Sequence, residues 1–85
     1  MRNVAFTPIA FQEYNDWFDT NKHLVVRIKA LIKDIDRDPF GGIGKPEPLK
    51  GNWAGYWIRR IDQEHRLIYK TSDTQILIAK CSGHY

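Results

Sequence analysis

Apolar residues recur at helical spacing through the first half of the chain. The clearest run has an apolar face on a segment whose opposite face carries Arg27, Lys29 and Lys33. The residues of this apolar face are Leu24, Val25, Ile28, Leu31, Ile32 and Ile35. The pattern predicts a helix that ends before Pro39, because the residue that precedes a proline is pushed out of the helical region.

A second helix is predicted just before this one. Thr7 followed by Pro8 is a favourable helix start, because a threonine side chain can cap free amide groups and proline fits the first turn. We expect this helix to run from Pro8 to about Asp19. Its expected buried face consists of Ala10, Tyr14, Trp17 and Phe18.

The second half of the chain has the pattern of strands. Residues 56–61 and 65–70 alternate as strands do, on either side of a short polar turn, which predicts a hairpin. Residues 75–82 predict a further, apolar strand, and the apolar residues 4–6 could start the sheet. Residues 39–55 are rich in glycine and proline and predict a long ordered loop.

This order of elements predicts an α+β fold. Two consecutive helices followed by hairpin-linked strands indicate helices packed on one face of a mostly antiparallel sheet, in the order β-α-α-β-β-β. The opposite face of the sheet is then free to carry a site. With 85 residues, the chain is expected to form a single domain over residues 1–85.

The formal net charge of +3 is unevenly distributed along the chain. Residues 1–42 contain equal numbers of basic and acidic residues, so the whole excess of positive charge lies in residues 43–85. We therefore expect a polyanionic partner to dock on the second half. A merely solvated basic face would have the same composition, so charge alone leaves both interpretations open.

Composition also excludes several classes of protein. The longest uninterrupted apolar run, Ile76 to Ala79, is far short of the roughly 20 residues that a membrane-spanning helix needs. The single cysteine, Cys81, cannot form an intramolecular disulfide, and the three histidines lack the spacing of a zinc site. We expect a cytoplasmic protein with no membrane segment, no metal and no other cofactor.

One loop carboxylate is held in an unusual way. Pro46 fixes the backbone before Glu47, and Pro48 restricts Glu47 itself to extended geometry. Its carboxylate is therefore expected to point in a defined direction, and Lys45 and Lys50 on either side favour its ionised form. The alternative is an ordinary exposed glutamate.

Three arginines and the C-terminal residues supply further candidates. Arg59, Arg60 and Arg66 lie in the predicted hairpin, and a three-residue turn places Arg60 opposite Arg66. Like charges at such a pair destabilise it unless a bound phosphate, or the carboxylate of Asp62, Glu64 or Glu47, offsets them. His84 and Tyr85 end the chain, and His84 could donate a proton if the last strand holds the tail in place. A frayed tail is the alternative.

Taken together, these residues resemble a known family. The run PFGGIGKPEPLKGNWAGYWIRRIDQEHRLIY and the ending CSGHY resemble the YoeB/Txe branch of the RelE-type bacterial toxins over nearly the whole chain. The resemblance implies a RelE-like sheet with two helices on one face. It also implies a toxin of a type II toxin-antitoxin system that cuts mRNA in the ribosomal A site. Implied partners are the 70S ribosome with its mRNA, a cognate YefM/Axe-like antitoxin with an acidic C-terminal tail, and a second copy of the chain in a homodimer.

The same resemblance assigns roles to individual residues. It places the catalytic residues of the family at Glu47, Arg66, His84 and Tyr85. We expect the neighbouring basic residues to contact the substrate, namely Lys45, Lys50, Arg59 and Arg60. Metal-free RNA cleavage needs a base for the 2′-hydroxyl, a cation for the phosphorane and an acid for the leaving oxygen. The alternative is a non-catalytic module that binds RNA or the ribosome and blocks translation by occupancy.

Overall fold

The computed structural model describes residues 1–84, and its elements match the predicted order with two additions, a short strand and a 3-10 helix. The elements are β1 (Asn3–Phe6), α1 (Pro8–Thr20), α2 (Lys22–Arg37), β2 (Glu47–Pro48), the 3-10 helix η1 (Gly51–Trp53), β3 (Trp57–Arg60), β4 (Arg66–Thr71) and β5 (Gln75–Lys80). The two helices and the strands at both ends of the chain are confirmed. β2 and η1 lie within the segment 39–55, which the sequence predicts to be loop throughout.

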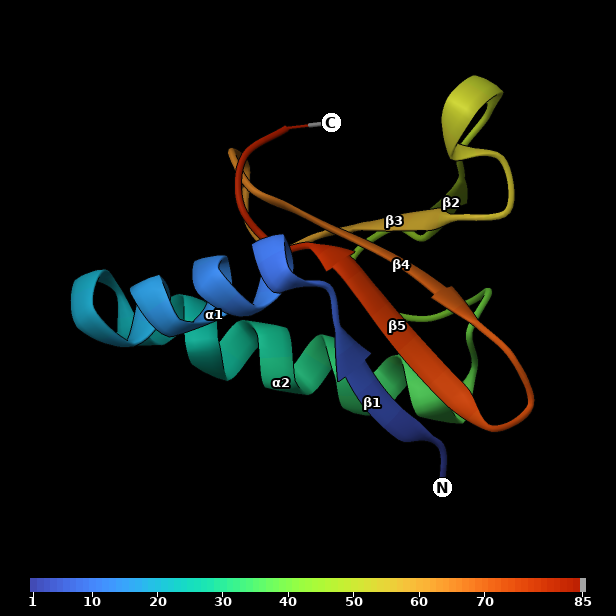
Figure 1. Ribbon diagram of the computed structural model, residues 1–85, viewed down its shortest axis with the longest axis horizontal. Coiled ribbons are helices and arrows are strands. Elements are labelled where there is room, and N and C mark those ends of the chain that lie inside the picture. Colours follow the sequence, from blue (N-terminus) through green and yellow to red (C-terminus); the bar gives the residue numbers. More distant parts are fainter. Residues whose placement is uncertain (85) are drawn as a thin grey trace.

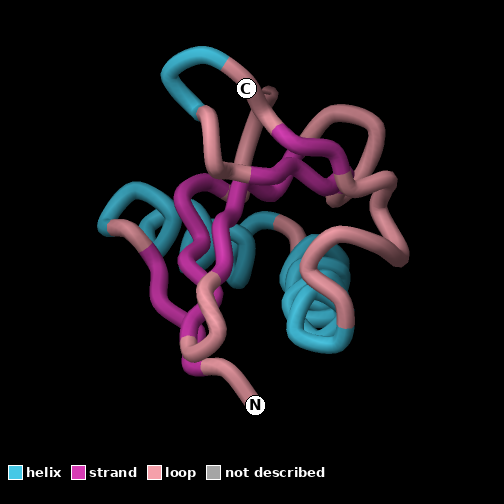
Figure 2. Tube along the Cα trace, turned by 90° about the vertical axis from the view of Figure 1, so that its right-hand side faces the viewer, coloured by secondary structure: helices cyan, strands magenta, loops and turns pink. Residues whose placement is uncertain are grey.

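The strands form a five-stranded sheet in the order β1-β5-β4-β3-β2. β1 runs parallel to β5, and the other neighbours are antiparallel, so the mostly antiparallel sheet is confirmed. Figures 1 and 2 show α1 and α2 side by side on one side of this sheet, whereas η1 projects from the other side. Neither helix is long and apolar enough to cross a lipid bilayer, within the described part of the chain.

The two helices begin where their capping residues predict. The Thr7 hydroxyl oxygen accepts a hydrogen bond from the backbone N–H of Ala10 at 3.1 Å and donates one to the carbonyl of Ala79 at 2.8 Å. This side chain therefore starts α1 and also ties it to the end of β5. Asn21 separates the helices, since it caps the end of α1 and the start of α2.

The hydrophobic core lies between α2 and the sheet. α2 contributes Ile28, Leu31 and Ile35, which are fully buried. The strands contribute Leu67, Tyr69, Ile76 and Ile78. The expected buried face of α1 is only partly correct: Ala10 is buried and Trp17 packs against the core, but 41% of Phe18 remains exposed.

Strand alternation decides which side chains face away from the helices. Leu67 in β4 belongs to the core, so its neighbour Arg66 points to the opposite face of the sheet. Arg59 in β3 is paired with Leu67, and Arg60 is paired with Arg66. Arg60 and Arg66 therefore share the face that the helices leave uncovered, as the predicted turn length requires.

Candidate active site

A small cleft lies on this uncovered face, where β2, β3 and β4 run beside one another. Its volume is about 180 Å³. Its lining consists of Lys45, Glu47, Leu49, Ile58, Arg59, Arg60 and Arg66, and the Arg59 side chain is itself buried. The cleft thus brings together one carboxylate and several cations from segments that are far apart in the sequence.

Glu47 reaches the cleft because its short strand pairs with β3. Glu47 lies opposite Ile58, and Pro48 lies opposite Trp57. Proline cannot donate to a sheet ladder, so β2 stays at the edge and only two residues long. The Glu47 side chain is exposed, and no group among residues 1–84 donates a hydrogen bond to its carboxylate. Both oxygens are therefore available to accept a proton or a hydrogen bond.

The backbone just before Glu47 is turned sharply into the cleft. Gly44 has φ of +81° and its carbonyl accepts a hydrogen bond from the backbone N–H of Arg60 at 2.7 Å. A Cβ at Gly44 would lie 2.9 Å from the Leu31 side chain, so only glycine fits this approach. Lys45 follows with φ of +53°, a conformation that is uncommon for a residue with a side chain. The positive φ angles of Gly44 and Lys45 turn the chain so that Lys45 and Glu47 lie beside β3.

Arg66 is held at the hairpin turn by one nitrogen of its guanidinium. Nη1 donates to the carbonyls of Asp62, Gln63 and His65, at 2.8, 3.2 and 3.1 Å. Arg60 lies directly opposite on β3. Neither guanidinium lies within 4.0 Å of a carboxylate oxygen in residues 1–84. Within the described residues no ion pair offsets this like-charged pair, and a bound phosphate stays a prediction.

Sheet geometry fixes how far apart the carboxylate and Arg66 lie. Two strand spacings across the sheet and two residues along it place the Cα atoms of Glu47 and Arg66 about 12 Å apart. Both side chains project from the same face of the sheet, because Glu47 pairs with Ile58, two residues from Arg60 in β3. The separation suits two groups that act on opposite sides of one phosphodiester.

The C-terminal tail runs beside Arg66. The backbone N–H of Arg66 donates to the carbonyl of Gly83 at 2.9 Å, and the N–H of Gly83 donates to Nδ1 of His65 at 2.8 Å. The tail is therefore tied down as far as Gly83, and His84, which comes next, is exposed. His84 and Lys50 do not line the cleft, and Tyr85 lies outside the described residues.

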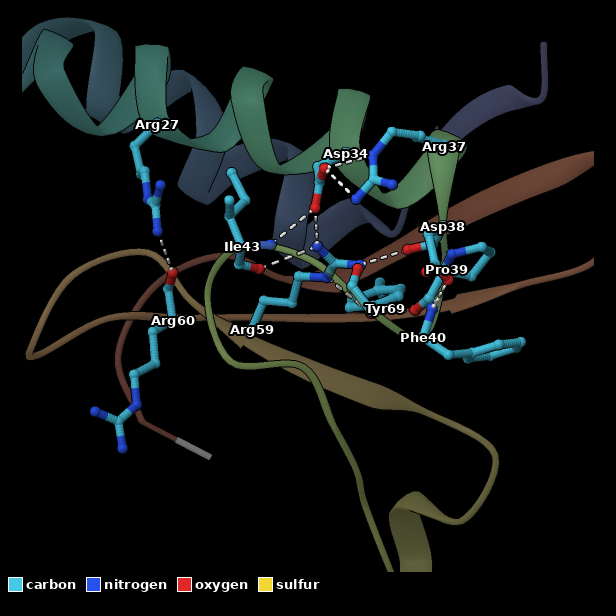
Figure 3. Close-up of polar contacts among 11 residues, drawn as sticks. Arg27, Asp34, Arg37, Asp38, Pro39, Phe40, Ile43, Arg59, Arg60 and Tyr69 are labelled. Atoms are coloured by element: carbon cyan, nitrogen blue, oxygen red, sulfur yellow. Dashed lines mark hydrogen bonds and ion pairs between the residues drawn. The ribbon is translucent and has the colours of Figure 1, made fainter.

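The structure corrects the expectation that Arg59 contacts the substrate. Its side chain is fully buried and points toward α2, whereas Arg60 extends away from it (Figure 3). The Arg59 guanidinium donates to the side chains of Asp34 at 2.6 Å and Tyr69 at 3.0 Å. It also donates to three loop carbonyls, those of Asp38, Gly41 and Ile43. Arg59 therefore has a structural role: it anchors the loop that leads to Glu47.

Asp34 is the counter-ion of this buried arginine. Partial burial alone would raise the pKa of its carboxyl group. Hydrogen bonds from the backbone N–H of Ile43 and from Arg59 and Arg37 outweigh burial and lower the pKa to about 2. The carboxylate therefore stays ionised throughout the physiological range and holds both the arginine and the loop.

Sequence reasoning identified neither Asp34 nor Tyr69 as part of this arrangement. Period-two alternation in β3 would have placed Arg59 on the same face as Trp57 and Ile61, toward the core. A charged residue on a core face needs a partner of opposite charge. The alternation could therefore have predicted that Arg59 is buried. It could not have predicted the partner, because Asp34 lies on another element and no local pattern marks it.

Known proteins share the fold and much of the sequence of this chain. The model of the YoeB-like toxins of bacterial type II toxin-antitoxin systems matches residues 6–85. The chain belongs to this family. A YoeB toxin from Synechocystis sp. is 55% identical over 83 residues, which is 96% of this chain and 95% of that protein.

Two solved YoeB structures from Staphylococcus aureus have the same fold. One is a YoeB dimer, with a TM-score of 0.94 and 47% identity, and the alignment covers 99% of this chain and 98% of the other. The second is a YoeB–YefM complex, with a TM-score of 0.92 and 48% identity, covering 100% of this chain and 99% of the other. This chain is therefore a RelE-like toxin of a type II toxin-antitoxin system.

Proposed function

We propose that this toxin is an endoribonuclease that cleaves mRNA in the ribosomal A site without a catalytic metal. The observation that carries the proposal is the cleft itself, in which the proline-flanked Glu47 faces Arg60 and Arg66. Two adjacent guanidinium groups with no carboxylate partner in residues 1–84 suit a phosphodiester. A carboxylate at the other side of the same cleft suits the removal of a proton.

The reaction follows from these groups. Glu47 takes the proton from the ribose 2′-hydroxyl, and the 2′-oxygen attacks the neighbouring phosphorus. Arg66, with Arg60 beside it, stabilises the negative charge that grows on the phosphorane. The bond from phosphorus to the 5′-oxygen then breaks, and His84 gives that oxygen a proton. The products are a 2′,3′-cyclic phosphate and a 5′-hydroxyl.

The remaining candidates contact the RNA rather than the reacting bonds. Lys45 lines the cleft, and Lys50 is exposed one residue after the lining residue Leu49. Both add positive charge along the path of the RNA backbone. For Tyr85 we keep the role suggested by the sequence, stacking on a base or orienting the scissile phosphate.

We propose that the ribosome supplies most of the binding and orientation. A cleft of about 180 Å³ is smaller than the 300–1,000 Å³ usual for a pocket that encloses a whole small molecule. The toxin can therefore hold a phosphate and part of a ribose, but not a run of nucleotides. The same proposal places the protein in the cytoplasm, where translating ribosomes are found. Purified toxin should cut free mRNA far more slowly than mRNA in the A site.

We also propose two protein partners. One is a YefM-like antitoxin with an acidic tail, because the related Staphylococcus aureus toxin forms a complex with YefM and the second half of this chain is basic. The other is a second copy of the chain, because a dimer of the Staphylococcus aureus YoeB is known. Size-exclusion chromatography with light scattering, with and without the antitoxin, tests both partners.

The test of the function compares matched variants on translating ribosomes. Glu47→Gln keeps the size of the side chain but removes the base, and we expect cleavage to fall about 100-fold or more. His84→Ala and Arg66→Ala should lose about 100-fold each, because each removes a group that acts in the transition state. Asp73→Asn makes the same carboxylate-to-amide change in the exposed turn before β5 and should cleave as the wild type does.

The ends of the RNA distinguish an enzyme from a blocker. Transcripts that end in a 2′,3′-cyclic phosphate, and that disappear with Glu47→Gln, support the proposed reaction. Stalled ribosomes with intact transcripts would support a toxin that acts by occupancy alone. Full toxicity in all three site variants would refute the site assignment.

A further inference from the structure

The hydrogen bond between His65 and the C-terminal tail has no role in the reaction described so far. The N–H of Gly83 donates to Nδ1 of His65 at 2.8 Å. The carbonyl of the same glycine accepts from the N–H of Arg66 at 2.9 Å. These two bonds clamp Gly83 from both sides, one residue before His84. Gly83 has φ of +75°, so the chain also turns at this clamp.

The His65 ring is itself held in a fixed orientation. It packs edge-on against Trp17 of α1, with ring centroids 4.7 Å apart at an interplanar angle of 71°. Its backbone N–H donates to the Asp62 carboxylate at 2.6 Å, which fixes the turn that carries it. Trp17 in turn donates from its indole nitrogen to the carbonyl of Cys81 at 2.9 Å. α1, the hairpin and the tail are thus joined through one imidazole and one indole.

The direction of the bond defines the state of the imidazole. A backbone N–H can only donate, so Nδ1 of His65 must carry a lone pair and the ring proton must sit on Nε2. Nε2 lies 3.7 Å from a carboxylate oxygen of Glu64, which favours that tautomer. The Asp62 carboxylate and the Arg66 guanidinium contact the backbone of His65. His65 therefore serves here as an acceptor and not as a proton donor.

We propose that His65 is a positioning residue that acts through His84. The inference rests on the proposed function, in which His84 protonates the leaving oxygen. Without the acceptor on His65, the tail keeps only one backbone bond at Gly83, and chain ends held this weakly fray. A misplacement of a catalytic group by about 1 Å can cost on the order of 100-fold in rate. His65 thus affects the chemical step without touching the RNA.

Two substitutions separate the hydrogen bond from the packing of the ring. His65→Phe keeps an aromatic ring against Trp17 but has no acceptor. His65→Asn loses the ring but places a carbonyl oxygen near the position of Nδ1. We expect His65→Phe to lower kcat on ribosome-bound mRNA by about 10- to 100-fold with little change in KM. His65→Asn should recover part of that loss although it packs less well.

The deciding comparison repeats His65→Phe in a His84→Ala background. If His65 acts only by placing His84, the second substitution causes no further loss of rate. An equal fold-loss in both backgrounds would overturn the inference, as would a wild-type kcat in His65→Phe. Urea unfolding of each variant shows whether the domain remains folded under assay conditions. A loss of rate that follows unfolding, with no recovery in His65→Asn, would also overturn it.

A measurement that needs no activity tests the bond directly. In the wild type, we expect an NMR coupling across the hydrogen bond between the Gly83 amide nitrogen and Nδ1 of His65. Its absence would overturn the inference even if the toxin cleaves RNA. If the wild type itself leaves ribosome-bound mRNA intact, the proposed function fails and the role of His65 fails with it. If the wild type cleaves and His65→Phe cleaves equally well, only the role of His65 fails.

Discussion

Replacing Asp34 by asparagine tests whether the buried Arg59 holds the loop that leads to Glu47. The Asp34 carboxylate accepts hydrogen bonds from Arg59 at 2.6 Å and from the N–H of Ile43 at 2.9 Å. Asp34→Asn keeps the shape of the side chain but leaves the charge of Arg59 buried without a counter-ion. Removing one partner of a buried ion pair costs about 3–5 kcal/mol. We expect Asp34→Asn to lower the free energy of unfolding by about 3 kcal/mol at pH 6.

The dependence on pH isolates the contribution of the charge. The pKa of Asp34 is lowered to about 2 in the folded protein, against about 3.9 for an aspartate in an unfolded chain. The folded state therefore releases this proton more readily, and the stabilisation is complete above the unfolded pKa and declines as the pH falls toward 2. A shift of this size is worth about 2–3 kcal/mol in total, of which about 1 kcal/mol is lost by pH 3.

Urea unfolding followed by tryptophan fluorescence at pH 6 and pH 3 measures this effect. The difference between wild type and Asp34→Asn should shrink by about 1 kcal/mol between the two pH values. Asp73→Asn is the matched control: its carboxylate is exposed in a turn, so its stability should stay within about 0.5 kcal/mol of the wild type. The reasoning is refuted if Asp34→Asn is as stable as the wild type at pH 6, or if the difference does not change with pH.

Two further predictions concern the Thr7 cap of α1 and the buried thiol of Cys81. Thr7→Ala removes both the cap of α1 and the bond to the carbonyl of Ala79, so it should cost about 1–2 kcal/mol in thermal or urea unfolding. Thr7→Ser keeps both bonds, and a loss as large as that of alanine would contradict this account. Burial and the nearby Glu13 raise the pKa of the Cys81 thiol to about 12, so a thiol reagent at pH 8 should label it only after unfolding. Rapid labelling of the native protein would contradict its buried position.

Much of the fold follows from local patterns in the sequence. The apolar face of α2, the cap at Thr7 and the alternation of β4 each depend on residues close together in the chain, and each predicted the element that forms. The pairing of Arg60 with Arg66 also followed from a local feature, the length of the turn between them. The length of this turn is why the two arginines share a face of the sheet.

The features that were missed depend on contacts between distant segments. β2 consists of only two residues, too few for any alternation, and it exists because Glu47 and Pro48 meet β3. The ordered path of the loop before it depends on the buried Arg59, whose partners lie from 10 to 25 residues away. The role of Tyr69, which donates from its hydroxyl to the carbonyl of Pro39 at 2.7 Å, is equally non-local. No local pattern specifies such partners, and only the folded chain brings them together.

The most direct test of the proposed reaction changes one atom of the substrate. An mRNA with a single 2′-deoxynucleotide at the cleaved position in the A site lacks the attacking oxygen but still binds the ribosome. Primer extension, with an unmodified mRNA in parallel, measures cleavage at that position. We predict that the unmodified transcript is cut and the deoxy transcript stays intact, because Glu47 then has no hydroxyl to deprotonate. Equal cleavage of the two transcripts would contradict the mechanism built on Glu47, Arg66 and His84.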